Sequence, residues 1–323
     1  MQMKKPILVI GPIFCDLLLS GYERMPEAGQ ELYLPDYTIS LGGNAIVASA
    51  LTQLDIPTSL LTTIGDDLMA EHLLALLREK GIREEHVIPL PGMKSNISCV
   101  FAHDGERSFL TWAQPRDTCN TAMARHAASL DPSLFSHIHL SFELLHIPEI
   151  QHFVQRAKER GTTVSTDLGF QDALRWKEEH FALLQAVDFF FPNLEEARLI
   201  TGASELNEML HRLQRWVAEP IITLGEKGVA SLMKDQGIVF CPAPTVEGIC
   251  NTTGAGDSFV AGFLFGRFHG MDLYESLRIG VATGSLTVAS EQSVSPDISR
   301  ARLQQMGVLD GYSAVRENRA AKK

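Results

Sequence analysis

Residues 251–266 read Asn-Thr-Thr-Gly-Ala-Gly-Asp-Ser-Phe-Val-Ala-Gly-Phe-Leu-Phe-Gly, a glycine-rich turn that runs directly into an apolar, helix-compatible segment. Gly254 and Gly256 permit backbone angles that other residues avoid, so the turn can aim several N–H groups at one point. The following helix adds its own unpaired N–H groups and the positive end of its dipole. The stretch therefore predicts an anion site.

Asp257 is the unusual member of this stretch, because a carboxylate beside an anion site repels the ligand. It makes sense if the acid accepts a proton from a nucleophile while the N–H groups hold the charge of a phosphoryl group. The other interpretation is an ordinary helix start with Asp257 as the N-cap or a first-turn acid. Two other phosphate-binding patterns are excluded, since no lysine follows as in G-x-x-x-x-G-K-[ST] and the spacing is not G-x-G-x-x-G.

A second glycine turn, Leu41-Gly42-Gly43-Asn44, runs into an alanine-rich segment near the start of the chain. Together the two turns resemble the two signatures of the ribokinase-like (PfkB-type) carbohydrate kinase family. These are a Gly-Gly pair with a polar residue near the N-terminus and a D-T-x-G-A-G-D motif near the C-terminus. The resemblance extends from Ile7 to about Asp297, and two signatures in the right order are more specific than either alone.

The bulk composition indicates a globular protein and excludes some functions. A net charge of −11 argues against a general nucleic-acid-binding protein, which usually has a basic excess. The five cysteines include no C-x-x-C pair, so a zinc site or disulfide framework is not expected and a reducing cytosol is favoured. No apolar run reaches the length of a membrane span. The length of 323 residues allows two small domains or one large α/β domain, and the resemblance implies a single kinase domain over residues 1–323.

Short apolar segments alternate with helical patterns along most of the chain, which predicts a mostly parallel sheet with helices on both faces. The expected strands are 7–10, 57–64, 136–141, 163–167, 189–191 and 221–224. The expected helices are 44–54, 68–80, 150–160, 194–201, 205–217, 258–269 and 273–290.

Two regions interrupt this alternation, at about 13–40 and 88–112, where short strand-like pieces occur without a helical pattern. They predict either extra strands on the edge of the main sheet or a separate small sheet. In the resembled family, such segments form a β-sheet lid over the sugar site, and the lid often makes a dimer contact. The resemblance thus implies an α/β protein with three α/β/α layers, a small lid and a homodimer.

Several residues are candidates for binding the phosphate acceptor. Asp16 follows the first predicted strand, and ligands of open α/β sheets bind beyond the carboxyl ends of the strands; an ordinary turn aspartate is the alternative. Gly42 and Gly43 would let the backbone approach a sugar, and Asn44 offers donors and acceptors but also fits a helix N-cap. The resemblance implies that these four residues bind the substrate. Asp167, at the end of a predicted strand, is a further candidate on the substrate side.

Two other motifs point to ATP. The stretch from Asn193 to Glu196 resembles the N-x-x-E motif of the family, which implies that Asn193 binds ATP and that Glu196 holds Mg²⁺ through ordered water. The same residues also match a capping box. The stretch Thr-Leu-Gly-Glu-Lys-Gly resembles a T-x-G-x-x-G turn, so Thr223, Gly225 and Gly228 are expected beneath the nucleotide.

One position departs from the family. Members usually carry Asp where this chain has Asn251, at a position that shapes the anion-binding loop and, in many members, a monovalent-cation site. Asn removes the charge, so a K⁺ site would lose Coulomb attraction, although carbonyls and hydroxyls near Thr253 and Ser293 could still suffice. The departure argues against K⁺ activation but not against kinase activity.

His137 and His139 alternate on a predicted strand and share one face. They suggest a metal, but a structural role is favoured because no third ligand is in register. The apolar run at 189–191 is expected to be sheet core rather than a stacking platform.

The function expected from the sequence is ATP-dependent phosphorylation of a hydroxyl, primary by expectation, on a small sugar. Asp257 would take the hydroxyl proton. The loop Gly254-Ala255-Gly256 and the N–H of Asp257 would stabilise the transferred phosphoryl group, with Mg²⁺ bridging the phosphates.

Two alternatives remain open at this stage. A nucleoside kinase of the same family would need an apolar cleft for the base, which Phe14, Phe101 and Trp112 could supply. A non-catalytic sugar- or nucleotide-sensing protein would keep the fold but would have no need of the base Asp257.

Overall fold

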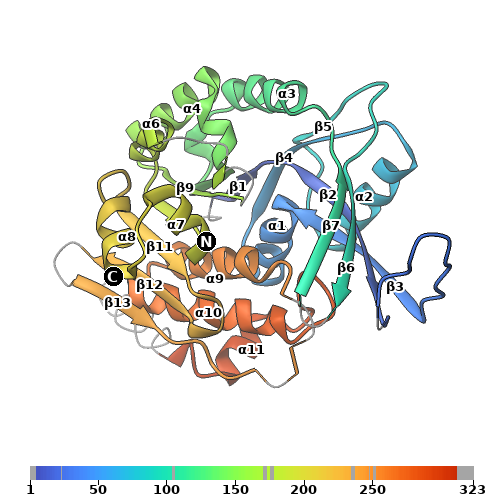
Figure 1. Cartoon of the computed structure of the whole chain (residues 1–323). Coiled ribbons are helices and arrows are strands. Elements are labelled where there is room, and N and C mark those ends of the chain that lie inside the picture. Colours follow the sequence, from blue (N-terminus) through green and yellow to red (C-terminus); the bar gives the residue numbers. More distant parts are fainter. Residues whose placement is uncertain are drawn as a thin grey trace.

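Two β-sheets organise the chain in the computed structural model, which describes residues 5–310 except 23, 104–105, 170–172, 175–177, 234–236, 247 and 250–251 (Figure 1). The large sheet comprises β1 (Ile7–Ile10), β4 (Thr58–Ile64), β5 (Val87–Pro89), β8 (His137–Ser141), β9 (Thr163–Asp167), β10 (Phe189–Phe191), β11 (Glu219–Thr223), β12 (Val229–Met233) and β13 (Gly237–Cys241). Its strand order is β13-β12-β11-β10-β9-β8-β1-β4-β5.

The seven strands from β11 to β5 in this order run parallel, whereas β12 pairs antiparallel with both of its neighbours, β11 and β13. Parallel strands are covered by helices on both faces, which favours apolar residues such as those of β1 and β10. β8 and β9 instead carry polar residues among their apolar ones. All four residues of β1 are fully buried, between β8 and β4. The predicted α/β fold with a mostly parallel sheet is confirmed.

Helices cover both faces of the large sheet, and each layer has its own hydrophobic cluster. One layer contains α1 (Asn44–Gln53), α2 (Leu68–Glu79), α9 (Ala255–Phe268), α10 (Leu273–Val288) and α11 (Arg300–Gln305). The other layer contains α3 (Arg116–Ser129), α4 (Pro148–Glu159), α6 (Glu178–Phe181), α7 (Leu194–Thr201) and α8 (Leu206–Leu213). Among the described residues, no helix is both long and apolar enough to cross a membrane.

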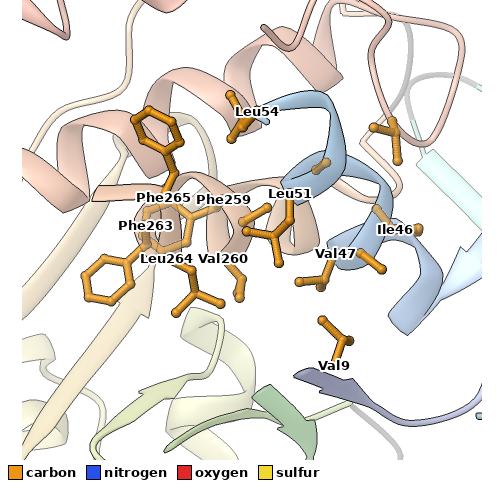
Figure 2. Packing of buried hydrophobic residues seen from close by; sticks show 14 of the residues in the cluster. Val9, Ile46, Val47, Leu51, Leu54, Phe259, Val260, Phe263, Leu264 and Phe265 are labelled. Atoms are coloured by element: carbon orange, nitrogen blue, oxygen red, sulfur yellow. The ribbon is translucent and has the colours of Figure 1, made fainter. Parts of the chain in front are cut away.

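Helix α9 is the central helix of its layer. It is apolar around most of its circumference because it lies between the sheet, α1 and α10. Figure 2 shows Phe259 and Phe263 of α9 beside Val47 and Leu51 of α1, above Val9 of β1, in one buried cluster. This packing fixes the N-terminus of α9, which carries the predicted anion site, relative to the sheet.

The two irregular regions of the sequence build the separate small sheet. It comprises β2 (Ile13–Ser20), β3 (Asp36–Gly43), β6 (Ile97–His103) and β7 (Glu106–Trp112), in the order β3-β2-β6-β7. It stands away from the large sheet on the side of β4 and α2 (Figure 1), so the alternative of extra edge strands is wrong for these four strands. Val87–Pro89, which overlaps the expected second region, instead pairs with β4 in the large sheet.

Asn96 connects β2, β6 and the end of β7 at one end of the small sheet. Its side-chain Nδ2 donates to the carbonyl of Ile13 at 2.8 Å, and its Oδ1 accepts from the N–H of Gln114 at 2.7 Å. Its backbone carbonyl accepts from the N–H of Cys15 at 2.9 Å. One buried amide thus ties β2, β6 and the end of β7 together where the small sheet meets the body.

Some element boundaries differ from the predictions. The helix expected over 258–269 begins at Ala255, because Gly254 adopts φ 78° and serves as the N-cap. The helix expected over 205–217 ends at Leu213. Two elements were not predicted from the sequence: α3, in which only Cys119, Met123, Ala124 and Ala127 are buried, and the β12–β13 hairpin.

Candidate active site

A cleft of about 390 Å³ opens at the carboxyl ends of five neighbouring parallel strands. Each strand contributes a residue at or just beyond its end: Pro12 from β1, Ser141 from β8, Asp167 from β9, Asn193 from β10 and Thr223 from β11. The first turn of α9 forms part of the wall. This is the edge of the sheet where open α/β proteins bind ligands.

The first turn of α9 has the geometry of an anion site. Gly254 is required at the N-cap, because a Cβ there would lie 2.1 Å from the carbonyl oxygen of Ser293 and the φ angle is 78°. The first full helical hydrogen bond runs from the N–H of Ser258 to the carbonyl of Gly254 at 2.8 Å. The N–H groups of Ala255, Gly256 and Asp257 precede this bond at the positive end of the helix dipole. Of these, the Ala255 N–H makes a long hydrogen bond of 3.4 Å to the carbonyl of Thr252. The Gly256 Cα faces open space along the cleft wall.

Asp257 lies in this first turn and lines the cleft. It is therefore a first-turn acid and not the N-cap. Burial raises its pKa from 3.8 to about 8, and repulsion from Asp167, Asp16 and Glu196 adds to the rise. A group with a pKa near neutrality, in a cleft and beside an anion site, has the properties of a general base.

The residues predicted to bind the acceptor lie together. Asp16 is buried on β2 opposite Ser40 and close to Gly42, where a Cβ would lie 2.3 Å from the Asp16 carboxylate. Glycine is thus required at 42 to leave room for that carboxylate. Asn44 is the first residue of α1 and lines the cleft; its Oδ1 accepts from the Ser141 hydroxyl at 2.8 Å. The N-cap of α1 is Gly43, so the N-cap interpretation of Asn44 is wrong.

Sequence analysis missed an ion pair in the cleft wall. Arg116, at the start of α3, donates through Nη1 to Oε2 of Glu143 at 2.6 Å, and both line the cleft. Glu143 follows β8 closely, so its place after a parallel strand was a signal for it. Arg116 carried no such signal, because no motif marks it and α3 was not predicted.

The predicted ATP motifs reach the same cleft in part. Asn193 and Glu196 form a capping box at α7: the Asn193 N–H donates to Glu196 Oε2 at 2.8 Å, and the Glu196 N–H donates to Asn193 Oδ1 at 2.9 Å. Both also line the cleft, so the capping and site interpretations hold for the same residues. Thr223 lines the cleft and forms a β-bridge with Asn193.

The two glycines that follow Thr223 do not line the cleft. Gly228 packs against the β13 backbone, where a Cβ would lie 2.1 Å from the carbonyl of Cys241, and its φ is 106°. Gly225 has a φ of 60° at the start of a 3₁₀ turn. Both glycines are explained by backbone conformation and packing.

The candidate cation site is described in part. Asn251 lies outside the described residues. Ser293 is fully buried, with its carbonyl against Gly254 and its hydroxyl 3.3 Å from that of Ser40. Within the described ranges, no group of three or more His, Cys, Asp or Glu side chains could hold a metal ion on its own.

The aromatic residues named for a base cleft do not converge. Phe14 lines the cleft on the face of the small sheet that carries Asp16. Trp112 pairs with Ile97, and Ile97 with Cys15; Phe101 likewise falls on the Cys15 face. Because successive residues of a strand point to opposite faces, Phe101 and Trp112 face away from the side occupied by Phe14.

Comparison with known proteins agrees with this geometry. The profile of the pfkB family carbohydrate kinases matches residues 4–300. A deoxyribokinase of Salmonella typhi is 27% identical over 303 residues, covering 91% of this chain and 96% of that protein. A cytidine kinase of Thermococcus kodakarensis is 28% identical over 284 residues, covering 85% of this chain and 93% of that protein. A solved ribokinase of Arabidopsis thaliana, complexed with ribose and ATP, has a TM-score of 0.74 at 21% identity, covering 94% of this chain and 98% of that one. The chain belongs to the pfkB family of carbohydrate kinases.

Proposed function

We propose that this protein transfers the γ-phosphoryl group of ATP to a hydroxyl group of a small sugar. As a family member it is a phosphotransferase with an alcohol group as acceptor, and ATP is the donor that the family implies. The observation that carries the proposal is one cleft that holds Asp257, at the N-terminus of α9, together with Asn44. A base, an anion site and hydroxyl-binding groups thus meet at one place.

The proposed reaction uses each of these groups once. Asp257 accepts the proton of the acceptor hydroxyl as the oxygen attacks the γ-phosphorus in line. The N–H groups of Ala255, Gly256 and Asp257 stabilise the negative charge of the transferred group, and the dipole of α9 adds to this. Asp16 and Asn44 hold the other hydroxyls of the sugar, so that one hydroxyl is presented to the base.

The residues of the cleft fit a magnesium ion carried by ATP. Mg²⁺ prefers oxygen ligands and keeps several waters, so it needs few protein groups. Glu196, a carboxylate on the nucleotide side of the cleft, would hold it through water. When bound, the ion neutralises charge on the phosphates. K⁺ is not required in this proposal, because Asn251 carries no charge.

The small sheet of β2, β3, β6 and β7 is proposed to act as the lid that the sequence predicted at about residues 13–40 and 88–112. It carries Asp16 on β2, so its movement would bring an acceptor ligand into place and exclude water that would hydrolyse ATP. The single-domain organisation of residues 1–323 is part of this proposal.

A homodimer formed through the lid is supported by exposed apolar residues on one face of the small sheet. Tyr37, Leu110 and Trp112 are 60%, 68% and 44% exposed. By strand register, all three lie on the face opposite Asp16. Exposed apolar patches of this kind mark interaction sites. Light scattering of the protein and of a Leu110→Lys variant checks this, since the variant should be monomeric.

The cytosol is the proposed location, with neither nucleic acid nor membrane as a partner. The four described cysteines, Cys15, Cys99, Cys119 and Cys241, are all free thiols, as a reducing compartment requires.

A nucleoside is the second candidate acceptor. It is favoured by the relative named a cytidine kinase and by Phe14, an aromatic ring in the cleft. It is weakened by the position of Phe101 and Trp112 on the other face of the small sheet. A sugar therefore remains the first choice.

The experiment that tests the function is ADP release with Mg-ATP over a panel of pentoses, hexoses, hexose phosphates and nucleosides, with and without K⁺. A sugar responder supports the proposal, and a nucleoside responder supports the second candidate. Asp257→Asn should abolish the response, whereas Glu159→Gln, at an exposed carboxylate of α4, should not. Absence of any acceptor-dependent ADP release would refute the proposed function.

A further inference from the structure

A line of polar side chains, most of them buried, runs along β8 and β9 of the large sheet toward Asp167. The Thr163 hydroxyl lies 2.7 Å from Nδ1 of His137, and Nε2 of His137 lies 2.7 Å from the Ser165 hydroxyl. The same hydroxyl lies 2.9 Å from Nδ1 of His139. Nε2 of His139 then lies 3.7 Å from Oδ2 of Asp167. The line begins at Thr163, an exposed residue at the start of β9, and ends at Asp167 in the cleft wall.

The strand register explains why these groups align. His137 pairs with Thr163 and His139 with Ser165, and alternate residues of a strand share a face. His139 and Ser165 are fully buried, and the ring of Phe191 lies 6.3 Å from that of His139. Burial of polar groups is costly unless they are hydrogen-bonded. The predicted structural role of the histidines accounts for every ring nitrogen here except Nε2 of His139, which has no hydrogen-bond partner among the described residues.

The hydrogen bonds along this line can run in two directions, and only one of them gives the Asp167 carboxylate a donor. A carboxylate of Asp167 can accept a hydrogen bond from His139 only if Nε2 of His139 carries a proton. In a neutral ring, Nδ1 is then an acceptor, which receives the Ser165 hydroxyl. Ser165 in turn accepts from Nε2–H of His137, and Nδ1 of His137 accepts from the Thr163 hydroxyl.

His137 has the charge state that this order requires. Burial, with repulsion from His139 and Arg267, holds the pKa of His137 well below its usual range. The ring is therefore neutral and has one donor and one acceptor nitrogen.

We propose that His139 is a positioning residue, which holds the carboxylate of Asp167 at the acceptor site through its Nε2–H, and that the line from Thr163 fixes His139 in this tautomer. The inference rests on the proposed kinase function, because Asp167 lines the same cleft as Asp257, raises the pKa of Asp257 by charge repulsion, and was predicted from the sequence to lie on the substrate side. The Asp167 side chain is 29% exposed and ends its strand, so without a partner it would lose rotamer freedom on binding a hydroxyl. The gap of 3.7 Å is of the kind that closes to a hydrogen bond when a substrate binds.

The tautomer is tested without any substrate. In protein labelled with ¹⁵N at histidine, the long-range correlation of ring nitrogens and carbons identifies which nitrogen of His139 is protonated, and a His139→Gln variant assigns the signal. We expect the Nε2–H form in the wild type, and a mixture of tautomers in Ser165→Ala. A protonated Nδ1 in the wild type would overturn the proposal, whether or not the protein is active.

The positioning role is tested by acceptor kinetics. His139→Met keeps a similar volume without an N–H, whereas His139→Gln keeps a donor near the position of Nε2. We expect His139→Met to raise KM for the acceptor about tenfold, with little change in KM for ATP, and His139→Gln to restore most of the loss. A merely structural role would instead change both KM values or neither.

Ser231→Ala is the matched control for Ser165→Ala. Ser231 is an equally buried serine of the same sheet, and it donates to the carbonyl of Pro220 at 2.8 Å, away from the cleft. Ser165→Ala should raise the acceptor KM and Ser231→Ala should not. An acceptor KM within twofold of wild type in His139→Met would refute the inference while leaving the kinase function intact. An inactive wild type would refute the kinase function instead.

Discussion

Replacing Asp257 by Asn should make the stability of this protein less sensitive to pH. Burial and three neighbouring carboxylates raise the pKa of Asp257 to about 8 in the folded protein, against 3.8 for an ordinary aspartate. Between these values the folded state binds a proton that the unfolded state does not bind. Each pH unit in this range therefore removes about 1.4 kcal/mol of stability from the wild type.

The sign follows from the raised pKa. The contribution of Asp257 is fully present below the unfolded value of 3.8 and is lost as the pH rises toward the folded value of about 8. Asn does not titrate, so the free energy of unfolding of Asp257→Asn, relative to wild type, should rise with pH. Between pH 5 and pH 7 the relative gain should be about 2–3 kcal/mol.

Urea denaturation of both proteins at pH 5, 6 and 7 measures this difference, with Glu159→Gln as a control for the loss of an exposed carboxylate. Asp257→Asn should also lose about 10²- to 10⁴-fold in kcat, which is the usual contribution of a general base. If the stability difference between variant and wild type were equal at all three pH values, the folded protein would not hold a proton on Asp257. The argument from burial and carboxylate repulsion would then be wrong.

Three further substitutions test the acceptor side of the cleft, the anion-binding loop and the attachment of the small sheet. Asp16→Ala removes a buried carboxylate from the acceptor side and should raise the acceptor KM about 10- to 100-fold with KM for ATP unchanged, as steady-state kinetics with each substrate varied would measure. Gly254→Ala should lower both the melting temperature and kcat, because its Cβ would lie 2.1 Å from the Ser293 carbonyl and φ is 78°; unchanged values by thermal denaturation and ADP release would contradict the assigned loop. Asn96→Ala leaves the carbonyl of Ile13 and the N–H of Gln114 without their partner and should cost about 2 kcal/mol or more in urea denaturation, while a cost below about 0.5 kcal/mol would show that the amide does not tie the small sheet to the body.

The sequence was informative wherever function depends on local backbone chemistry. The Gly-rich turn before 255–268 and the Gly-Gly turn before 44–53 could be identified because close approach and positive φ require glycine, and glycines with fixed spacing are visible in a sequence. The capping box at Asn193 and Glu196 was predictable for the same reason, since both partners lie within one helical turn. The strands at 7–10 and 189–191 were predicted with their observed bounds because short apolar runs predict buried parallel strands.

The sequence was less informative where the signal depends on residues distant along the chain. The helix at 116–129 has a mostly polar surface and little periodicity, so it was missed, and Arg116 was missed with it. The start of α9 was placed at 258 instead of 255, because Gly254 and Gly256 are unfavourable for a helix by propensity. In the structure Gly254 is the N-cap, a position that glycine favours, and only Gly256 lies within the first turn.

What the sequence by itself determined is the alternation of strands and helices, the two glycine turns and the family to which they belong, because each is written in neighbouring residues. What only the tertiary structure decided is which side chains meet. The raised pKa of Asp257 depends on burial and on carboxylates from three other elements, and the line from Thr163 to Asp167 depends on the pairing of two strands. Phe101 and Trp112 fell on the far face of the small sheet for the same reason: strand register, which fixes the face of every side chain, is set by partners elsewhere in the chain.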